Sequence, residues 1–72
     1  MNSKLDKLAE IEGYPNATAM LEASVMDSVV PCICMNEGCD ASSNLEPDCR
    51  KGYCEECQEQ SMQSCLIIAG LI

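Results

Sequence analysis

Apolar residues recur at helical spacing at the start of the chain. Leu5, Leu8 and Ile11 would share one face of a helix over residues 2–12, which Ser3 can cap. The Gly-Tyr-Pro sequence that follows predicts its end, because Gly suits a helix C-terminus and Pro cannot continue the hydrogen-bond ladder. The sequence therefore begins with a short amphipathic helix.

A second helix is expected over residues 16–27. Asn16 is a favourable first residue, and the following segment is rich in helix-forming Ala, Leu and Glu without a breaker. Isolated helices of this length are marginal in water, so both must pack on something. Two helices joined by a short turn predict an N-terminal helical hairpin or an L-shaped pair over residues 1–28.

The pattern changes from helical to extended at residue 29. Residues 29–34 are rich in β-branched residues and cysteine, and Pro31 would be tolerated at a sheet edge or strand start. Residues 40–48 are polar and turn-rich, which predicts a hairpin arm, and residues 51–54 resemble a short return strand. This region therefore predicts one β-hairpin.

Helical periodicity returns near the end of the chain, from Glu59 onward. The apolar positions fall at helical spacing: Met62, Cys65, Leu66, Ala69 and Ile72. Ser61 could cap this helix. A strand over residues 65–68 is the competing interpretation, because two isoleucines lie there, but we favour the helix.

Composition limits how such a chain can be stabilised. With 72 residues, two Tyr and neither Phe nor Trp, it is one domain with a small core. Aliphatic side chains and Met must fill that core, and we expect four of the methionines in it: Met20, Met26, Met35 and Met62. Domains of this size commonly need a disulfide or metal cross-link.

The cysteines offer such a cross-link. There are seven cysteines and no His, so a bound metal would be held mainly by thiolates. Cys54 and Cys57 form a C-x2-C pair, typical of structural zinc sites. Cys34 and Cys39 form the partner pair, with an intervening Gly for the turn, and predict a four-cysteine zinc site. Cys32 and Cys49 remain alternative ligands, and Cys65 is expected in the core.

Cysteines in a short chain can also form disulfides, bind an iron–sulfur cluster or act as reactive thiols. A disulfide scaffold fits the cysteine content of a short chain, but an odd number leaves one thiol unpaired. An iron–sulfur cluster also takes four thiolates. Cys49, beside Arg50 and Lys51, could be a reactive thiol, although an incidental loop cysteine is the simpler interpretation.

The charge balance constrains the partners. The formal net charge is −8, from twelve acidic and four basic residues. Such a surface repels nucleic acid and anionic membranes and favours basic protein surfaces. Without a signal-like or membrane-spanning segment, we expect a cytoplasmic protein, where cysteine pairs usually bind metal.

Several motifs together resemble a known group. The opening stretch over residues 4–14, the Cys34–Cys39 pair, the Cys54–Cys57 pair and the apolar ending occur in an order that resembles small zinc-ribbon-like, four-cysteine proteins of bacteriophages and bacteria. The resemblance implies zinc on Cys34, Cys39, Cys54 and Cys57. It is consistent with a viral or a bacterial origin, and a viral protein of this kind would lie in the host cytoplasm. The resemblance implies no activity.

The sequence thus predicts a small α+β zinc-binding domain. Two N-terminal helices (residues 1–28) precede a zinc-bound hairpin of zinc-ribbon or treble-clef type and a C-terminal helix (residues 29–72), within one compact domain. A helix directly after Cys57 would favour the treble-clef form.

A closed all-thiolate site leaves no metal position for a catalytic water, so we expect no enzymatic activity. The expected function is an acidic protein-interaction module that modulates a host protein or transcription complex. The alternatives are a nucleic-acid-binding zinc ribbon and a thiol-redox or metal-handling protein. The apolar ending could instead serve as a homodimer face.

Overall fold

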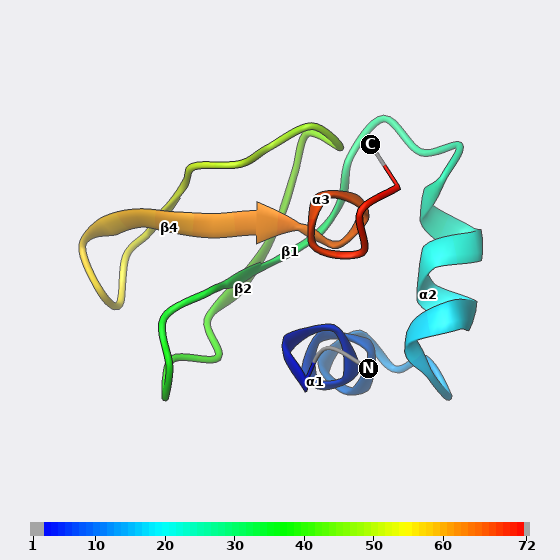
Figure 1. Ribbon diagram of the computed structural model, residues 1–72, viewed down its shortest axis with the longest axis horizontal. Helices are drawn as coiled ribbons and strands as arrows, with labels where there is room; N and C mark the ends of the chain where they lie inside the picture. The colour runs from blue at the N-terminus through cyan, green and yellow to red at the C-terminus, as the bar shows by residue number, and fades with distance from the viewer. Residues whose placement is uncertain (1–2, 72) are drawn as a thin grey trace.

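Two helices, four strands and a final short helix follow one another along the chain in the computed structural model, which describes residues 3–71. The helices lie toward one end of the molecule, and the strands with their loops extend toward the other (Figure 1). In chain order the elements are α1 (Ser3–Glu12), α2 (Ala17–Ser24), β1 (Val30–Cys34), β2 (Ser42–Leu45), β3 (Gly52–Cys54), β4 (Glu59–Ser64) and α3 (Cys65–Ile68). The predicted α+β class is therefore confirmed.

Helix α1 has the predicted end and part of the predicted apolar face. Leu5 and Leu8 are buried, whereas Ile11 is 43% exposed. The Tyr14 N–H donates to the Ala9 carbonyl (2.9 Å), and Gly13 has a φ of +85°, which together form a Schellman C-cap. The expected start at residue 2 lies outside the described residues, as does the capping side chain of Ser3.

Helix α2 begins where predicted but ends earlier. The Asn16 side chain accepts a hydrogen bond from the Ala19 N–H (2.8 Å), which confirms the N-cap. The helix ends at Ser24 instead of continuing to Asp27. Residues 25–29 are all exposed, so a further turn would have no buried face to stabilise it. Met26 lies in this segment and is 91% exposed, so its expected place in the core was wrong.

The strands form one antiparallel sheet in the order β2-β1-β4-β3. β1 is buried along its whole length, pairing with β2 on one side and β4 on the other. The predicted single hairpin was wrong, because β2 and β3 do not pair and lie at opposite edges of the sheet. Each edge strand instead forms its own hairpin, β1–β2 and β3–β4.

Pro31 lies near the start of a central strand, and hydrogen-bond alternation explains why it is tolerated. The Cys34 N–H donates to the Ala41 carbonyl (2.9 Å), so the backbone groups of Cys34 face β2. Backbone groups alternate in direction along a strand, so those of Pro31, three residues earlier, face β4. Pairing with β4 begins only at Cys32, opposite Ser64. The missing N–H of Pro31 therefore falls where β4 has ended, at a strand start as expected.

The C-terminal helix is shorter and later than predicted. Residues 59–64 form β4, because they pair with β1 in the register Cys34↔Met62. Ser64, not Ser61, caps the following helix, accepting a hydrogen bond from the Ile67 N–H (3.1 Å). Both the long helix from Glu59 and the competing strand over residues 65–68 were wrong, and a strand instead of a helix follows Cys57. The reason given for a treble-clef form is thereby removed.

Two apolar clusters hold these elements together. The larger joins α1, α2, β1 and α3 and has the fully buried members Leu8, Met20, Val30, Ile33 and Cys65. The smaller contains Cys34, Cys54 and Met62 and lies under the two hairpins. The expected core roles of Met20, Met62 and Cys65 are therefore confirmed, and Met35 packs against the larger cluster.

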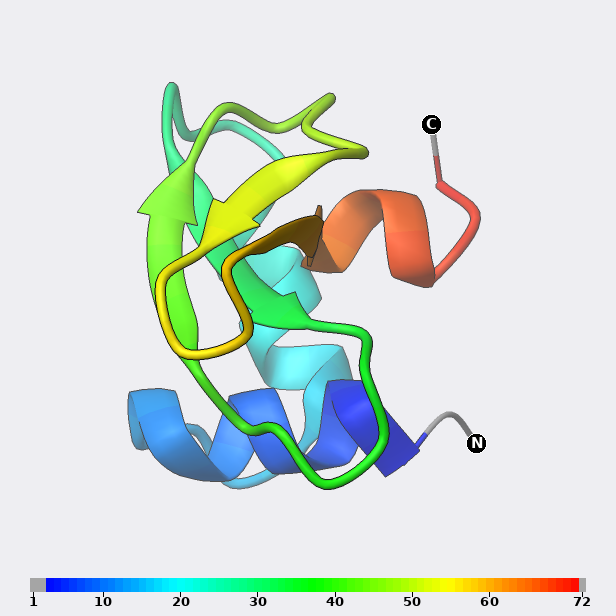
Figure 2. The same cartoon turned by 90° about the vertical axis from the view of Figure 1, so that its left-hand side faces the viewer.

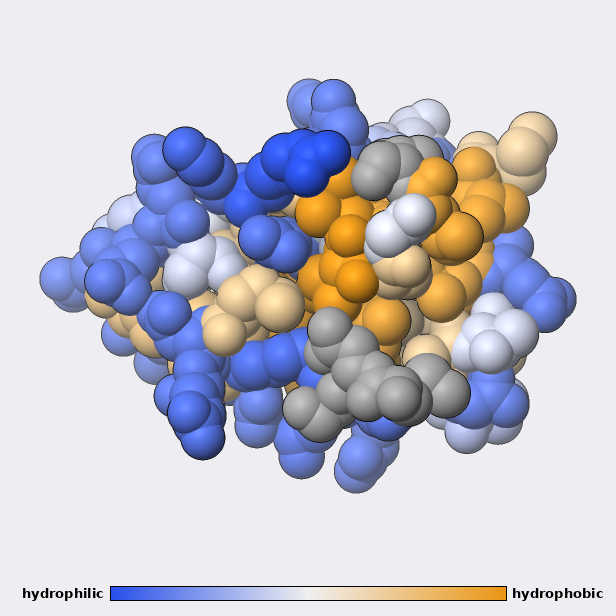
Figure 3. Space-filling model, in the orientation of Figure 1, coloured by the Kyte–Doolittle hydropathy of each residue, from blue (hydrophilic) through white to orange (hydrophobic). Residues whose placement is uncertain are grey.

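The surface follows the same division. In Figure 3 apolar atoms gather over α3 and the connection from α2 to β1. The opposite end of the molecule, which holds the two hairpins and is called the hairpin end below, is hydrophilic. Among residues 3–71, no helix combines the length and the apolar character needed to cross a bilayer.

Candidate metal centre

Two turns present the four predicted cysteines, one turn in each hairpin. Cys34 ends β1 and Cys39 follows in the turn toward β2, where Gly38 adopts a φ of +84°. Such a left-handed conformation suits glycine, which explains the Gly in this turn. Cys54 ends β3 and Cys57 follows in the tight turn toward β4. The pairing of β1 with β4 brings the two turns side by side (Figure 2).

The sulfurs of these cysteines form one cluster. All four Sγ atoms lie within 4.8 Å of one another, with Cys34 and Cys57 at 3.8 Å and Cys39 and Cys54 at 3.7 Å. Thiolates at about 2.3 Å from a tetrahedral metal ion are separated by about 3.8 Å, so these distances match the edge of such a site. They exceed a disulfide bond of about 2.05 Å, and all seven cysteines are free. The cluster could therefore hold a metal ion.

The cluster is partly shielded from solvent. Cys34 and Cys54 are fully buried, and Cys39 and Cys57 are half-buried. Met62 packs against them from β4, and Ala41 and Leu45 contribute apolar atoms from the β2 side. The site therefore has a protected inner side formed by the two strand ends and an outer side formed by the two turns.

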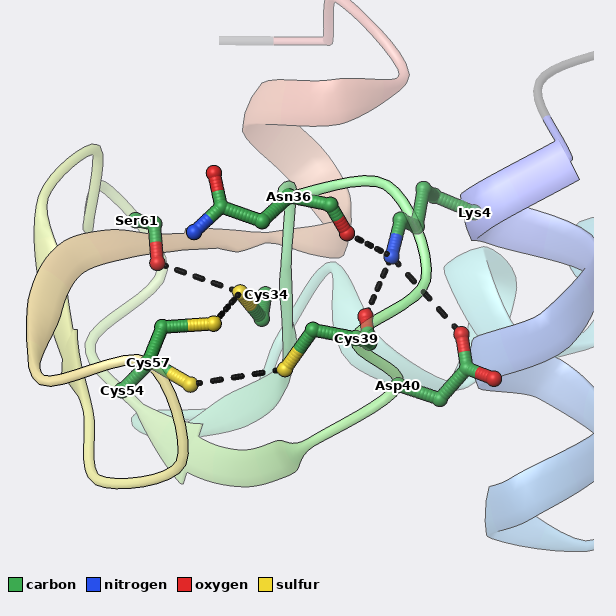
Figure 4. Close-up of polar contacts among 8 residues, drawn as sticks. All are labelled: Lys4, Cys34, Asn36, Cys39, Asp40, Cys54, Cys57 and Ser61. Atoms are coloured by element: carbon green, nitrogen blue, oxygen red, sulfur yellow. Dashed lines mark hydrogen bonds and ion pairs between the residues drawn. The ribbon is translucent and has the colours of Figure 1, made fainter.

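Polar contacts connect the two turns beyond the sulfurs. The Ser61 hydroxyl lies 3.1 Å from the Cys34 sulfur, a position where it can donate a hydrogen bond to a thiolate (Figure 4). The Asn36 side-chain amide donates to the Glu59 carboxylate (2.7 Å), which joins the first turn to the start of β4. The sequence suggested a helix cap for Ser61, but its position in β4 directs it to the sulfur cluster instead.

Lys4 is the residue that sequence reasoning missed. Its ammonium group donates hydrogen bonds to the carbonyl of Asn36 (2.8 Å) and to that of Cys39, and it lies 3.7 Å from the Asp40 carboxylate (Figure 4). The Lys4 side chain is only 16% exposed. Helix α1 therefore holds the Cys34–Cys39 turn in place through these hydrogen bonds, and it places a positive charge beside the turn. The only sequence signal is a Lys among the polar positions of an amphipathic helix.

The thiols are unequal in acidity. Burial opposes ionisation of Cys34, but hydrogen bonds from the Ser61 hydroxyl and the Asn36 backbone outweigh it and lower its pKa to about 7. The Ala41 backbone N–H favours the Cys39 thiolate, but sharing the site with the Cys57 thiol, together with burial, raises the pKa of Cys39 to about 12. Of these two thiols, Cys34 therefore ionises more readily than Cys39.

The remaining three cysteines lie outside this cluster. Burial raises the pKa of Cys32 to about 12, and burial likewise raises the pKa of Cys65. Cys49 is half-buried instead of exposed as expected, and its carbonyl accepts a hydrogen bond from the Ser64 N–H (3.0 Å). The rival ligands Cys32 and Cys49 are therefore not part of the four-sulfur group.

Comparisons with known proteins give no relative of this chain. No family model, no curated protein and no solved structure matches it. The resemblance to zinc-ribbon-like proteins of bacteriophages and bacteria therefore stays a prediction.

Proposed function

We propose that this chain is a non-enzymatic protein-interaction module stabilised by one zinc ion. The ion would be bound by Cys34, Cys39, Cys54 and Cys57. The observation that carries the proposal is the set of sulfur separations of 3.7 and 3.8 Å, which fits a single tetrahedral ion. A multi-iron cluster lies between its thiolates and would hold them farther apart. Four-thiolate tetrahedral sites are typical of zinc.

A zinc ion, when bound, would supply a cross-link between the two hairpins. Each hairpin contributes one cysteine at a strand end and one in the following turn, the arrangement of a zinc ribbon. The apparent binding free energy of structural zinc is about 10–16 kcal/mol, more than the net stability of most small domains. The fold of the hairpin end would therefore depend on the metal.

Lys4 and Ser61 are placed to stabilise the negative charge of a zinc-bound four-cysteine site. Four thiolates and one zinc ion carry a net charge of −2, which nearby donors must stabilise. The Ser61 hydroxyl is placed to donate to Cys34, and the Lys4 ammonium lies behind the Cys34–Cys39 turn. Such outer contacts commonly tune metal affinity.

The surface charge points to the class of partner. All twelve acidic residues are exposed, whereas of the four basic residues one, Lys4, is half-buried against the first turn. The outward field is therefore strongly negative, which repels phosphate backbones and attracts basic protein surfaces. A closed four-thiolate site would also leave no metal position for substrate or water. We therefore propose a protein with a basic face as the partner.

Affinity capture tests this proposal. The zinc-loaded chain is immobilised and exposed to lysate at low and high salt, and the captured proteins are identified by mass spectrometry. We expect capture of a basic protein that high salt releases and that the chelated chain does not retain. Capture of nothing at low salt, or equal capture by the chelated chain, would contradict the proposal.

A further inference from the structure

The two edges of the sheet approach each other on one side of the molecule. β2 and β3 are the edge strands, yet residues of both line one cavity of about 250 Å³, together with Met62 of β4. The sheet is therefore curled enough to turn its free edges toward a common space. Figure 2 shows both strands, β2 in lime green and β3 in yellow, on the same side of the molecule. We name this space the edge cavity.

The edge cavity has a distinctive set of walls. Its floor is the buried Met62, and its other lining residues include Ser42, Ser43, Tyr53, Glu55 and Glu56. The volume is below the roughly 300–1,000 Å³ of small-molecule sites. It is therefore better suited to a single long side chain than to a cofactor.

The charged and aromatic groups determine what kind of side chain fits. Tyr53 is 57% exposed, and Glu55 and Glu56, in the turn between Cys54 and Cys57, are also exposed. Among residues 3–71, neither glutamate has an ion-pair partner within 4.0 Å. An ammonium or guanidinium group would meet two carboxylates and a tyrosine ring, which attracts cations through its π-face. The complementary side chain is therefore Lys or Arg.

The backbone of β2 offers a second means of recognition. Because Cys34 hydrogen-bonds to the Ala41 carbonyl, ladder alternation turns the N–H and C=O of Ser42 and Asn44 away from β1. These groups face the open edge, where β2 has no further strand neighbour within residues 3–71. An extended peptide can add to such an edge as another strand, and its alternate side chains then point to one side.

We propose that the edge cavity is the docking site for an extended, basic segment of a protein partner. The segment would pair with the open edge of β2 and insert one Lys or Arg between Tyr53 and the Glu55–Glu56 pair. This inference rests on the proposed interaction function and names the surface that carries it. The net charge of −8 supports a basic partner over a second copy of this chain, which would be repelled.

Peptide binding by the full-length chain tests this site. The probe is a fluorescent peptide of about nine residues that alternates lysine with threonine, a strand-like length and pattern. A matched peptide carries glutamine in place of lysine. Fluorescence anisotropy at physiological salt gives the Kd of each. We expect binding of the lysine peptide only.

Three variants separate docking at this site from general charge attraction. The double variant E55Q/E56Q is expected to weaken binding about tenfold, since it removes two ion pairs. Tyr53→Leu is expected to weaken it about threefold. Ser42→Pro removes an outward N–H but no ladder bond, and should weaken binding about fivefold without altering net charge. Circular dichroism tests whether each variant folds.

A matched control removes the same charge elsewhere. E12Q/E22Q changes two exposed helix carboxylates and should leave the Kd within about twofold. Equal weakening by E12Q/E22Q and E55Q/E56Q would overturn the edge cavity as the site while leaving the acidic interaction module standing. Absence of lysine-peptide binding would also overturn the edge cavity as the site. The capture experiment with lysate would still test the proposed interaction module independently. If Ser42→Pro does not fold, the glutamate pair and its control still decide the question.

Discussion

Replacement of Lys4 by Met should destabilise the turn that carries Cys34 and Cys39 of the four-cysteine cluster. The Lys4 ammonium group donates to the carbonyls of Asn36 and Cys39, which belong to the turn between β1 and β2. Met keeps most of the aliphatic length but removes the charge and the donors. The two carbonyls would then lose partners in a half-buried position, where water replaces them only in part.

The expected magnitude follows from these contacts. Two hydrogen bonds contribute about 1 kcal/mol each, and the ion pair with the half-exposed Asp40 adds little. A loss of about 2 kcal/mol is a large part of the roughly 4–11 kcal/mol expected for a chain of this size. The unfolding midpoint should fall by about 8–16 °C. Because the turn carries two of the four sulfurs, zinc affinity should fall about tenfold.

Thermal unfolding by circular dichroism and zinc competition with a chelating dye measure these effects. Lys7→Met is the matched control, since it removes the same charge from an exposed position on α1. It should shift the midpoint and the zinc affinity only slightly. If Lys4→Met and Lys7→Met behave alike, the loss reflects net charge, and fastening of the turn by Lys4 is refuted.

Three further predictions concern individual side chains. Cys34→Ser should abolish metal binding and unfold the hairpin end, whereas Cys49→Ser should keep one metal per chain; elemental analysis and amide NMR dispersion check both. Ser61→Ala should lower zinc affinity about tenfold through loss of the donor to Cys34, and wild-type affinity in a dye competition would refute it. Iodoacetamide at mildly alkaline pH should modify Cys49 before Cys32, since burial raises the pKa of Cys32 to about 12 and removes its thiolate; peptide mapping that finds Cys32 modified first would contradict this.

Local chemistry made parts of the fold predictable from the sequence. The Gly13 cap of α1 and the Asn16 cap of α2 depend on contacts within a few residues, and the structure has both. The grouping of the four cysteines in two pairs was also predictable from the sequence, because each pair lies in its own turn. What these features share is short sequence separation.

Features that depend on distant pairing were not predictable. Residues 59–64 have helical periodicity, yet they form β4 because Cys34 and its neighbours in β1 provide a partner strand. The same pairing places Ser61 beside the Cys34 sulfur. Lys4 contacts carbonyls 32 and 35 residues away, so no local pattern could indicate its role. The edge cavity likewise depends on distant pairing, because the sheet order places β2 and β3 at the two edges that line it.

Native mass spectrometry before and after chelation tests the four-cysteine zinc site most directly. We predict one zinc ion per chain, with the remaining cysteines as free thiols. Chelation should remove the ion and shift the chain to the higher charge states of an unfolded ensemble. A metal-free chain whose mass is lower by a pair of hydrogens for each disulfide, or a chain that carries iron, would contradict the zinc site.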